Sequence, residues 1–308
     1  MSIDLSDLDA PIEPELMNPV LACIETRSTT RAFSDEPVTD LERHAILHAA
    51  SRAPSAGAMM FYSMISVDDP DLRKRVCNVC DDQHFMYKAP FWLLFVVDNR
   101  KWLDLYQYVG CYDDPSLAQF PEHARHKPGV GELLLSCEDA MCAAQTAVIA
   151  AESLGIGSCY IGDVIEHGEE LADALDLPPA TVPLALVVFG HKRPQDEVSV
   201  SVSCTVDDAP APEATAPSAP INTPHPVTNL YMPERYRQAD QATLDAQIAE
   251  LDAKFTPHAV AKGAPAGERV RKLYHRKHTS DFMAEMNRSA AWWIVRWCTD
   301  AVDDGTQA

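Results

Sequence analysis

The sequence has little positive charge and no long apolar stretch. Its 308 residues include 25 lysines and arginines against 46 aspartates and glutamates, which gives a net charge of −21. A surface this acidic repels phosphate backbones, so we expect no nucleic acid among its partners. The longest uninterrupted apolar run is Phe91–Val97. A membrane-spanning helix needs roughly 20 apolar residues, so we expect a protein that does not span a membrane.

The N-terminal segment has none of the features of a targeting signal. Residues 1–26 contain six acids and neither lysine nor arginine, whereas a secretory signal begins with positive charge and a transit peptide is rich in arginine. The nine cysteines are an odd number without a framework spacing, which indicates reduced thiols. We therefore expect a cytoplasmic protein in which residues 1–18 form an acidic lead-in.

Several catalytic and binding motifs are absent. Residues 155–157 start like a dinucleotide fingerprint, but Tyr160 stands where the third glycine belongs. Cys77 and Cys80 have no second pair at zinc-finger spacing, and the histidine pairs lack the glutamate of a metalloprotease helix, so we expect no metal site. The sequence also has no Gly-x-Ser-x-Gly turn and no phosphate-binding loop of the nucleoside-triphosphatase type.

Between residues 19 and 193 the chain alternates helical and strand patterns. Thr39 and Glu42 form a capping box, which predicts a helix that ends before Pro54. Phe91–Val97 is apolar at every position, as expected for a central strand covered on both faces. The other predicted elements are a strand at Phe61–Val67, a helix from Pro70, an alanine-rich helix at Leu133–Leu154 and a strand at Val182–Phe189.

The C-terminal part has a different composition. Residues 207–226 contain six prolines among small and polar residues, which is typical of an extended linker. Two helical patterns follow, an amphipathic one at Asp240–Phe255 and a basic one at Glu268–Trp297. We interpret the basic residues as a solvated helix face rather than a phosphate site, and the tryptophans as packing residues rather than a cofactor site.

Two separated segments combine basic, hydroxyl and small residues. In the first, Arg27 and Arg31 are four residues apart with Ser28 and Thr29 between them, and arginine forks with hydroxyl donors suit a phosphate dianion. The same pattern also fits two surface arginines near a helix start. The second segment, Arg52–Ala58, contains a proline and a glycine. These residues either let the backbone approach a flat ligand or form an ordinary loop.

A third segment, Gly155–Asp163, follows the alanine-rich helix and precedes the strand pattern at Pro183–His191. In chain order the motifs read Arg-x-x-x-Arg-x-Phe, Ala-Pro-Ser-Ala-Gly, Gly-x-Gly-Ser-Cys-x-Ile-Gly and Pro-x-Ala-Leu-Val-x-x-Gly. This order, over residues 19–193, resembles the FMN-dependent nitroreductase superfamily. The resemblance implies an α+β, three-layer fold with a central mixed sheet flanked by helices, in an obligate homodimer with FMN at the subunit interface.

The resemblance also implies roles for individual residues. Arg31 faces the pyrimidine edge of the flavin, where a cation stabilises the negative charge of the reduced ring. The backbone of Ile161 and Gly162 lies near flavin N5. The implied phosphate ligands are Arg27, Ser28 and Thr29, completed by Lys192 or Arg193. The implied loop from the partner subunit contains Pro54, Ser55, Ala56, Gly57, Ala58 and Met60.

The activity that the resemblance implies is a ping-pong reduction. NADH or NADPH reduces FMN at N5, and an electron-poor small molecule such as a nitroaromatic or a quinone then takes the electrons. The flavin carries the chemistry, so no catalytic protein residue is implied. The implied domains are an FMN-binding domain at 19–206, the linker at 207–226 and a C-terminal helical extension at 227–308.

The loop after Ala-Pro-Ser-Ala-Gly departs from the family pattern. Many nitroreductases carry Asn-x-Gln-Pro there, but this chain has Ala58-Met59-Met60-Phe61. Two polar side chains are replaced by apolar ones, so backbone or water must satisfy the flavin edge. The apolar version is similar to flavin dehydrogenases that oxidise peptide azolines. Such a substrate-specific dehydrogenase, an enzyme that consumes FMN to make a cobalamin base, and a flavin-binding protein without turnover stay open as alternatives.

Overall fold

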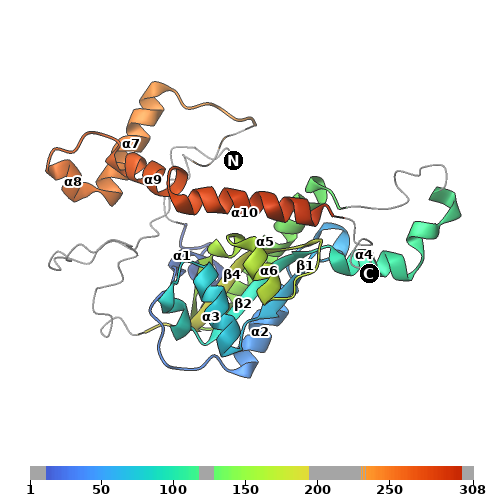
Figure 1. Ribbon diagram of the computed structural model, residues 1–308. Coiled ribbons are helices and arrows are strands. Elements are labelled where there is room, and N and C mark those ends of the chain that lie inside the picture. Colours follow the sequence, from blue (N-terminus) through green and yellow to red (C-terminus); the bar gives the residue numbers. More distant parts are fainter. Residues whose placement is uncertain (1–11, 118–127, 194–229, 231, 233, 300–308) are drawn as a thin grey trace. The chain divides into compact units, whose positions relative to one another are not determined.

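The computed structural model describes residues 12–117, 128–193, 230, 232 and 234–299. The chain forms two compact units (Figure 1). The sheet unit comprises residues 18–220 and 288–308, and the helical unit comprises residues 1–17 and 221–287. The predicted linker at 207–226 lies outside the described residues, and so does most of the acidic lead-in.

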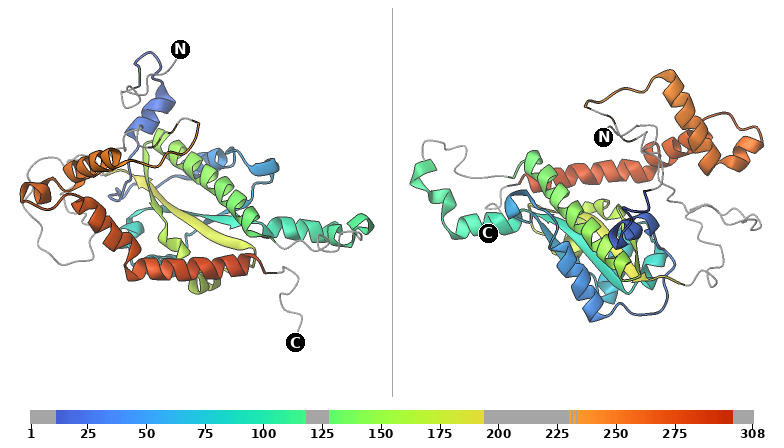
Figure 2. Two further views of the ribbon diagram at one scale, coloured as in Figure 1. Left: turned by 90° about the horizontal axis from the view of Figure 1, so that it is seen from above. Right: turned by 180° about the vertical axis from the view of Figure 1, so that it is seen from behind.

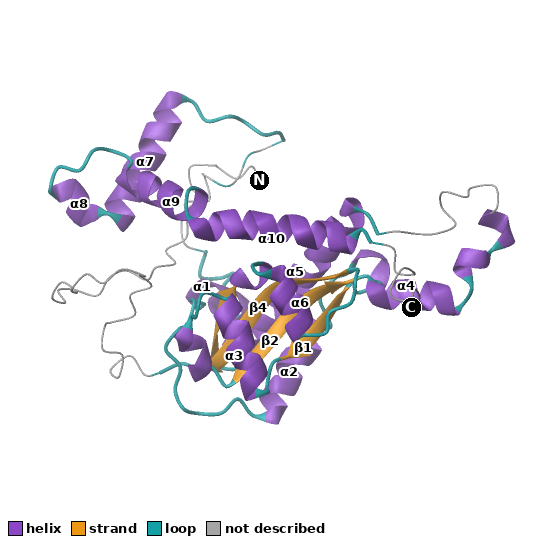
Figure 3. Ribbon diagram, viewed as in Figure 1, coloured by secondary structure: helices purple, strands orange, loops and turns teal. Residues whose placement is uncertain are grey.

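The sheet unit is built on a four-stranded sheet with the strand order β1-β2-β4-β3. The strands are β1 at Tyr62–Ser66, β2 at Phe91–Asp98, β3 at Ile156–Ile161 and β4 at Thr181–His191 (Figure 3). Strands β1, β2 and β4 lie where the sequence patterns predicted them. The sequence predicted no strand at β3, because Gly157 and Ser158 interrupt the pattern of β-branched and aromatic residues.

Every strand pair in the described residues is antiparallel, so the expectation of a mixed sheet is wrong for this part of the chain. A parallel contact occurs only as an isolated bridge between Thr29 and Ser158 in these residues. Strand β2 is buried along its whole length except at Asp98, a pattern often found in parallel sheets. The cause is the same here, because helices cover both faces of the sheet although its strands are antiparallel.

Helices lie on both faces of the sheet (Figures 1 and 2). Helix α5, Val130–Ser153, and helix α2, Asp40–Ala50, cover one face, whereas α3, Pro70–Val79, and α6, Gly168–Ala174, cover the other. Helix α5 approaches closely because its inward side consists mostly of small residues. Its buried alanines are Ala140, Ala143, Ala144, Ala147 and Ala151. This arrangement of helix, sheet and helix is the predicted three-layer α+β fold.

Local sequence signals set the ends of these helices. Thr39 caps α2 in the predicted capping box, in which its amide donates to the Glu42 carboxylate over 2.7 Å and its hydroxyl accepts from the Glu42 amide. Asp69 caps α3, with Pro70 in the first turn. Helix α5 ends just before Gly155, whose φ of +78° lets the chain turn directly into β3.

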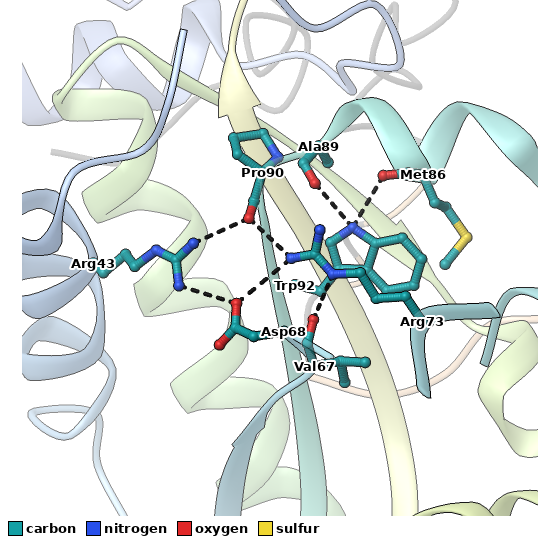
Figure 4. A network of polar contacts seen from close by, with 8 residues as sticks. All are labelled: Arg43, Val67, Asp68, Arg73, Met86, Ala89, Pro90 and Trp92. Atoms are coloured by element: carbon teal, nitrogen blue, oxygen red, sulfur yellow. Dashed lines mark hydrogen bonds and ion pairs between the residues drawn. The ribbon is translucent and has the colours of Figure 1, made fainter. Parts of the chain in front are cut away.

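A polar network ties α2 and α3 to the start of β2 (Figure 4). The carbonyl of Pro90 accepts hydrogen bonds from Arg43 of α2 over 3.1 Å and from Arg73 of α3 over 2.9 Å. Asp68 pairs with the same two guanidinium groups, at 3.1 and 3.5 Å. Arg73 also stacks over Trp92, with its guanidinium carbon 5.1 Å from the ring centroid. The network holds one helix from each face at the same end of β2.

Further helices complete the sheet unit. They are α1 at Pro19–Thr26, α4 at Arg100–Tyr108 and residues 288–297 of α10, which spans Asp281–Trp297. Short 3-10 turns lie at Ala56–Ala58 (η2), His84–Lys88 (η3), Cys111–Asp113 (η4), Pro115–Leu117 (η5) and Asp163–Ile165 (η6). Trp293 and Trp297 are buried in the core of this unit, which confirms that they are packing residues.

The helical unit contains α7 at Gln241–Phe255, α8 at Pro257–Ala261 and α9 at Glu268–His278. Asp252 of α7 is buried and accepts hydrogen bonds from the amides of Arg269 over 2.8 Å and Gly267 over 2.6 Å. These amides hold the pKa of Asp252 below its usual value, and the carboxylate fixes the start of α9. Most basic side chains of α9 are exposed, as the solvated-face interpretation predicted.

Helix α5 alone, among the described residues, has the length and apolar composition of a membrane span. Nine of its residues are buried within the sheet unit, as in a core helix. The eight cysteines in the described part of the chain are all free thiols, as predicted.

Candidate functional site

The opening motif, residues 27–33, lies along the edge of the sheet formed by β3. The amide of Thr30 donates to the carbonyl of Ser158 in β3 over 2.8 Å. Further on, the amide of Ser34 donates to the carbonyl of His191 at the end of β4 over 2.9 Å. The structure therefore brings together three motifs that are far apart in the sequence: the two arginines, the Gly-x-Gly-Ser segment and the end of the last strand.

Close packing at this edge requires a glycine. A Cβ atom built on Gly157 would lie 2.3 Å from the hydroxyl oxygen of Thr30 and 2.7 Å from its Cβ. No other L-residue fits there unless the opening motif moves away from β3. Backbone approach, and not a dinucleotide-binding turn, thus explains the second glycine of the motif.

Arg27 and Lys192, two of the predicted phosphate ligands, both influence the pKa of the Cys23 thiol. Burial and the Glu152 carboxylate raise the pKa of Cys23, while the charges of Lys192 and Arg27 oppose this effect. Lys192 also forms an ion pair with Glu152. Burial raises the pKa of Tyr160 to about 12, again against the opposing charge of Arg27. Arg27 and Lys192 therefore both lie near Cys23, and Lys192 is there paired with the Glu152 carboxylate of α5.

The remaining predicted phosphate ligands lie on the same edge. Thr29 bridges to Ser158 of β3, and Ser28 precedes it in the same half-buried stretch. The amide of Arg193 donates to the carbonyl of Ala32 over 3.2 Å, so the chain after β4 is attached to the opening motif. The five predicted phosphate ligands therefore lie near the same edge of the sheet in one chain.

Arg31 offers a buried hydrogen-bond donor, its Nε atom, that has no acceptor among the described residues. Its Nε atom is buried and has no hydrogen-bond partner in the described residues, and its guanidinium carbon lies 5.9 Å from the centroid of the Phe85 ring. An unsatisfied buried donor costs on the order of 1–3 kcal/mol. A ligand oxygen at this position would remove that cost, and the pyrimidine edge of a flavin carries carbonyl oxygens.

The Ser55 loop, residues 54–60, is held by one buried carboxylate. Asp139 of α5 is 4% exposed. One of its oxygens accepts from the Ser55 hydroxyl over 2.7 Å and from the Phe61 amide over 3.1 Å, and the other accepts from the Ala56 amide over 2.8 Å. The Ser55 hydroxyl in turn accepts from the Met60 amide over 2.6 Å. Asp139 therefore fixes both ends of the loop.

The backbone of this loop is strained where the sequence departs from the family pattern. Gly57, Ala58 and Met60 all have left-handed φ values, at +57°, +56° and +51°. Glycine adopts this conformation freely, and asparagine tolerates it better than other residues with a Cβ atom do. Ala58 and Met60 have neither advantage and cost about 1 kcal/mol each. The hydrogen bonds to Asp139 keep the loop in this conformation.

The predicted N5 contact lies on a tight turn after β3. Ile161 is buried, whereas Gly162 is exposed and a Cβ atom added to it would meet nothing within 4 Å. Turn η6 follows directly, and its Ile165 amide donates to the Gly162 carbonyl over 3.2 Å. Gln83 donates to the Asp163 carboxylate over 2.6 Å. The backbone of Gly162 is thus exposed, and the hydrogen bonds of Ile165 and Gln83 hold the turn that follows it.

The predicted site residues form two groups that are far apart within one chain. The opening motif pairs with β3 at one edge of the sheet, and the Ser55 loop leads into β1 at the other edge. Three strand spacings separate these edges by about 14 Å. Ser158 is level with Phe189 on β4, and Tyr62 is level with Val182, which adds about 24 Å along the strands. One chain does not bring the two groups to the same small ligand.

The chain belongs to the nitroreductase family, whose pattern residues 24–191 match. It is similar to the FMN reductase (NAD(P)H) of Bacillus subtilis, with 32% identity, and to the oxygen-insensitive NADPH nitroreductase of Salmonella typhimurium, with 34% identity, each over 176 residues. The alignments cover 57% and 56% of this chain and 66% of each relative. The chain therefore spans slightly less than two thirds of the length of these relatives.

Solved structures show the same fold. The structure of NfrA2 from B. megaterium covers 89% of this chain, and 98% of its own chain is matched, with a TM-score of 0.65 and 20% identity. The NADPH:FMN oxidoreductase from Vibrio harveyi, solved in complex with NAD+, covers 84% of this chain and is matched over 97% of its own, with a TM-score of 0.59 and 18% identity. These structures show the fold, and the match over residues 24–191 confirms the predicted family.

Asp139, Gln83 and the residues of α10 that contact η6 are not among the residues that the sequence predicted for the site. Asp139 had a detectable signal, because it lies on the buried stripe of α5 that also contains Ser136, Ala140 and Ala143. A carboxylate on a buried stripe requires hydrogen-bond donors, so it points to a neighbouring loop. Gln83 gave no comparable signal, because its partner Asp163 lies in a separate turn.

Proposed function

We propose that the protein is a cytoplasmic, homodimeric FMN-dependent oxidoreductase. It takes a hydride from NADH or NADPH and passes the electrons to an electron-poor small molecule such as a nitroaromatic or a quinone. The names of the relatives support the cofactor and the electron donor. One observation carries the proposal: the opening motif is held against β3 with a buried Arg31 donor that no described residue satisfies.

The residues at the β3 edge fit the anionic end of FMN. Arg27 and Lys192, the latter paired with Glu152, both place their charges near Cys23, and the Ser28 and Thr29 hydroxyls follow Arg27 in the chain. Guanidinium and hydroxyl donors suit a phosphate dianion. The protein as a whole is strongly acidic, with a net charge of −21, so a local basic group of this kind is what an anionic cofactor requires.

The residues next to it fit the flavin ring. The Arg31 guanidinium supplies positive charge at the pyrimidine edge, where reduction places negative charge. The backbone of Gly162 is exposed, so an amide of the Ile161–Gly162 segment can approach the edge of the ring that carries N5. FMN, when bound, supplies hydride transfer at N5. The chain's own task is to bind the flavin, to stabilise its reduced charge and to leave one face open for the nicotinamide and then the acceptor.

The separation of the two residue groups supports a site shared between two chains. Tyr62, which follows the Ser55 loop at the start of β1, lies about 14 Å across the sheet and about 24 Å along the strands from Ser158, which pairs with the opening motif. A second copy of the chain can supply its own Ser55 loop to the first copy's opening motif. Two-fold symmetry then creates two equivalent sites per dimer.

A second candidate function is favoured by the Ser55 loop itself. Ala58 and Met60 stand where many relatives in the family carry amides, and both have left-handed backbone conformations that an apolar side chain does not favour. The flavin edge that faces this loop would therefore be more apolar than in family members that carry the two amides. A substrate-specific flavin dehydrogenase, with oxygen as the electron acceptor, fits this chemistry.

Anaerobic reduction tests the proposal. The purified protein is supplied with FMN, freed of unbound flavin, and mixed without oxygen with NADH or NADPH while the visible flavin absorbance is recorded. We expect rapid loss of the flavin colour and its return on addition of a nitroaromatic. Loss of colour with an organic substrate alone would favour the dehydrogenase, and a flavin that no donor reduces would contradict both enzyme functions.

A further inference from the structure

The C-terminal end of α10, residues 288–297, is hydrogen-bonded to the turn that follows Gly162. Ser289 donates to the carbonyl of Ile165 over 2.6 Å and accepts from the amide of Gly168 over 2.9 Å. The indole nitrogen of Trp293 donates to the same Ile165 carbonyl over 3.2 Å. Ser289 and Trp293 are 0% and 1% exposed. Two buried side chains of one helix thus fix a single peptide carbonyl.

Ile165, the residue that carries this carbonyl, is joined to the predicted N5 contact by one backbone hydrogen bond from its amide. The amide of Ile165 donates to the carbonyl of Gly162, which closes turn η6. Asp163, in the middle of the turn, is held by Gln83. The backbone between Gly162 and Ile165 is therefore fixed at one end by α10 and in the middle by Gln83. A shift of Ile165 would therefore act on Gly162 through this hydrogen bond and the backbone of the turn.

The approach of α10 to this turn leaves no spare room. A Cβ atom built on Gly168 would lie 2.7 Å from the Trp293 indole nitrogen, 2.8 Å from the Trp292 ring and 2.9 Å from the Ser289 hydroxyl. Arg288 adds a two-point ion pair with Glu169, at 2.7 and 2.8 Å. The helix end is thus seated tightly on the start of α6, and its contacts with η6 follow from that seating.

A matched tryptophan lies on the same helix. Trp297 is 0% exposed, and its indole nitrogen donates to the carbonyl of Gly129 over 3.0 Å. Gly129 directly precedes α5 and belongs to no turn that leads to Gly162. Trp293 and Trp297 therefore make the same kind of hydrogen bond from the same helix, but only Trp293 makes it to η6.

We propose that Ser289 and Trp293 are positioning residues for the flavin-facing backbone at Ile161–Gly162, an inference that rests on the proposed function. The end of α10 lies beyond residues 24–191, which match the family. Its role is to hold the turn after Gly162 through the Ile165 carbonyl, without contacting the flavin. An amide stabilises developing charge only while its direction and distance are held, and a backbone that relaxes loses that effect. The C-terminal helix thus sets how well the turn supports the reduced flavin.

The test compares Trp293→Phe with Trp297→Phe in the full-length chain, with Ser289→Ala as a second variant at η6. Trp293→Phe and Trp297→Phe each remove one buried hydrogen bond and keep an aromatic ring, whereas Ser289→Ala removes the two bonds of its hydroxyl and keeps the Cβ atom. Hydrogen exchange of the peptide that contains residues 161–166 is measured in the FMN-free protein. The midpoint potential of bound FMN and the rate of anaerobic hydride transfer from NADPH are measured at saturating FMN.

We expect both tryptophan variants to melt at similar, lowered temperatures. Trp293→Phe and Ser289→Ala should speed the exchange of residues 161–166 by about tenfold or more, since the turn loses part of its hydrogen bonding. They should lower the midpoint potential of bound FMN and slow hydride transfer about three- to tenfold, as a displaced amide would. Trp297→Phe should leave exchange in this peptide, the potential and the transfer rate unchanged.

Equal exchange, potentials and transfer rates in Trp293→Phe, Ser289→Ala and Trp297→Phe would overturn the inference. If Trp293→Phe fails to fold, Ser289→Ala alone decides the outcome. A wild-type protein that takes up FMN but is not reduced by NADH or NADPH overturns the proposed function, and the exchange measurement on the FMN-free protein still decides whether α10 holds the turn.

Discussion

Replacing Asp139 by asparagine removes the charge that holds the Ser55 loop. One oxygen of Asp139 accepts from the Ala56 amide, and the other accepts from the Phe61 amide and the Ser55 hydroxyl. Wherever the new NH₂ group is placed, it therefore faces a backbone N–H. A buried donor left unpaired costs about 1–3 kcal/mol, and the weaker bonds that remain add about 1 kcal/mol.

The expected loss of about 2–4 kcal/mol is a large part of the stability of a unit of this size. It corresponds to a melting temperature lower by roughly 5–15 °C, which thermal unfolding followed by circular dichroism would record. The loop residues Ala58 and Met60 no longer have support for their left-handed conformations. We therefore expect FMN affinity, measured by quenching of flavin fluorescence, to fall about tenfold or more.

Asp252→Asn provides a matched control for this substitution. Asp252 is also 4% exposed and accepts two backbone amides, at 2.6 and 2.8 Å, but it lies in the helical unit. We expect it to destabilise the start of α9 and to leave FMN affinity unchanged. An Asp139→Asn protein that binds FMN as tightly as the wild type would refute the role of Asp139 in holding the loop.

Three further predictions concern the β3 edge and the capping box. Gly157→Ala should expel FMN and lower stability by about 1–3 kcal/mol, since its Cβ has no room. Arg27→Ala should abolish retention of FMN on gel filtration, whereas Arg276→Ala, on the exposed face of α9, should not. The Thr39 amide holds the pKa of Glu42 below its usual value. The stabilising contribution of the ionised Glu42 carboxylate is complete above its pKa in the unfolded chain, and it is lost as the pH falls through its lower pKa in the folded protein. Glu42→Gln should therefore reduce the loss of stability that the protein shows at acid pH, measured in a pH series.

Each of these has a clear contrary result. A yellow Arg27→Ala protein after gel filtration would remove the phosphate assignment, and equal flavin loss in Arg276→Ala would show that the effect is one of overall charge. A fully stable, FMN-loaded Gly157→Ala protein would contradict the close approach of the opening motif to β3. If the stability of Glu42→Gln falls at acid pH as much as that of the wild type, the capping box makes no pH-dependent contribution.

Local signals predicted most elements of the fold. The capping box at Thr39, the apolar run of β2 and the alanines of α5 each act over one turn or one strand, so they can be recognised without knowledge of the partners. Strand β3 was not predicted because glycine has low strand propensity. Gly157 occurs there because the opening motif packs so closely on β3 that a side chain has no room. The direction of neighbouring strands depends on the connections between them, and no single segment encodes it.

The site could be predicted only where a residue's own chemistry is distinctive. The arginines of the opening motif and the small residues of the Ser55 loop stand out in the sequence. The structure adds the groups that hold them, such as Asp139 and Trp293. Trp293 binds a backbone carbonyl, a group that every residue has, and no pattern in the sequence identifies that partner.

The central claim is that each FMN is held by the opening motif of one chain and the Ser55 loop of its partner. A mixed dimer of one Arg27→Ala chain and one Asp139→Asn chain, isolated with two different affinity tags, tests it most directly. One of its two sites combines both defects, and the other combines an intact opening motif with an intact loop. We predict one FMN per mixed dimer and almost none in either homodimer of the variants, whereas a mixed dimer without FMN would contradict the shared site.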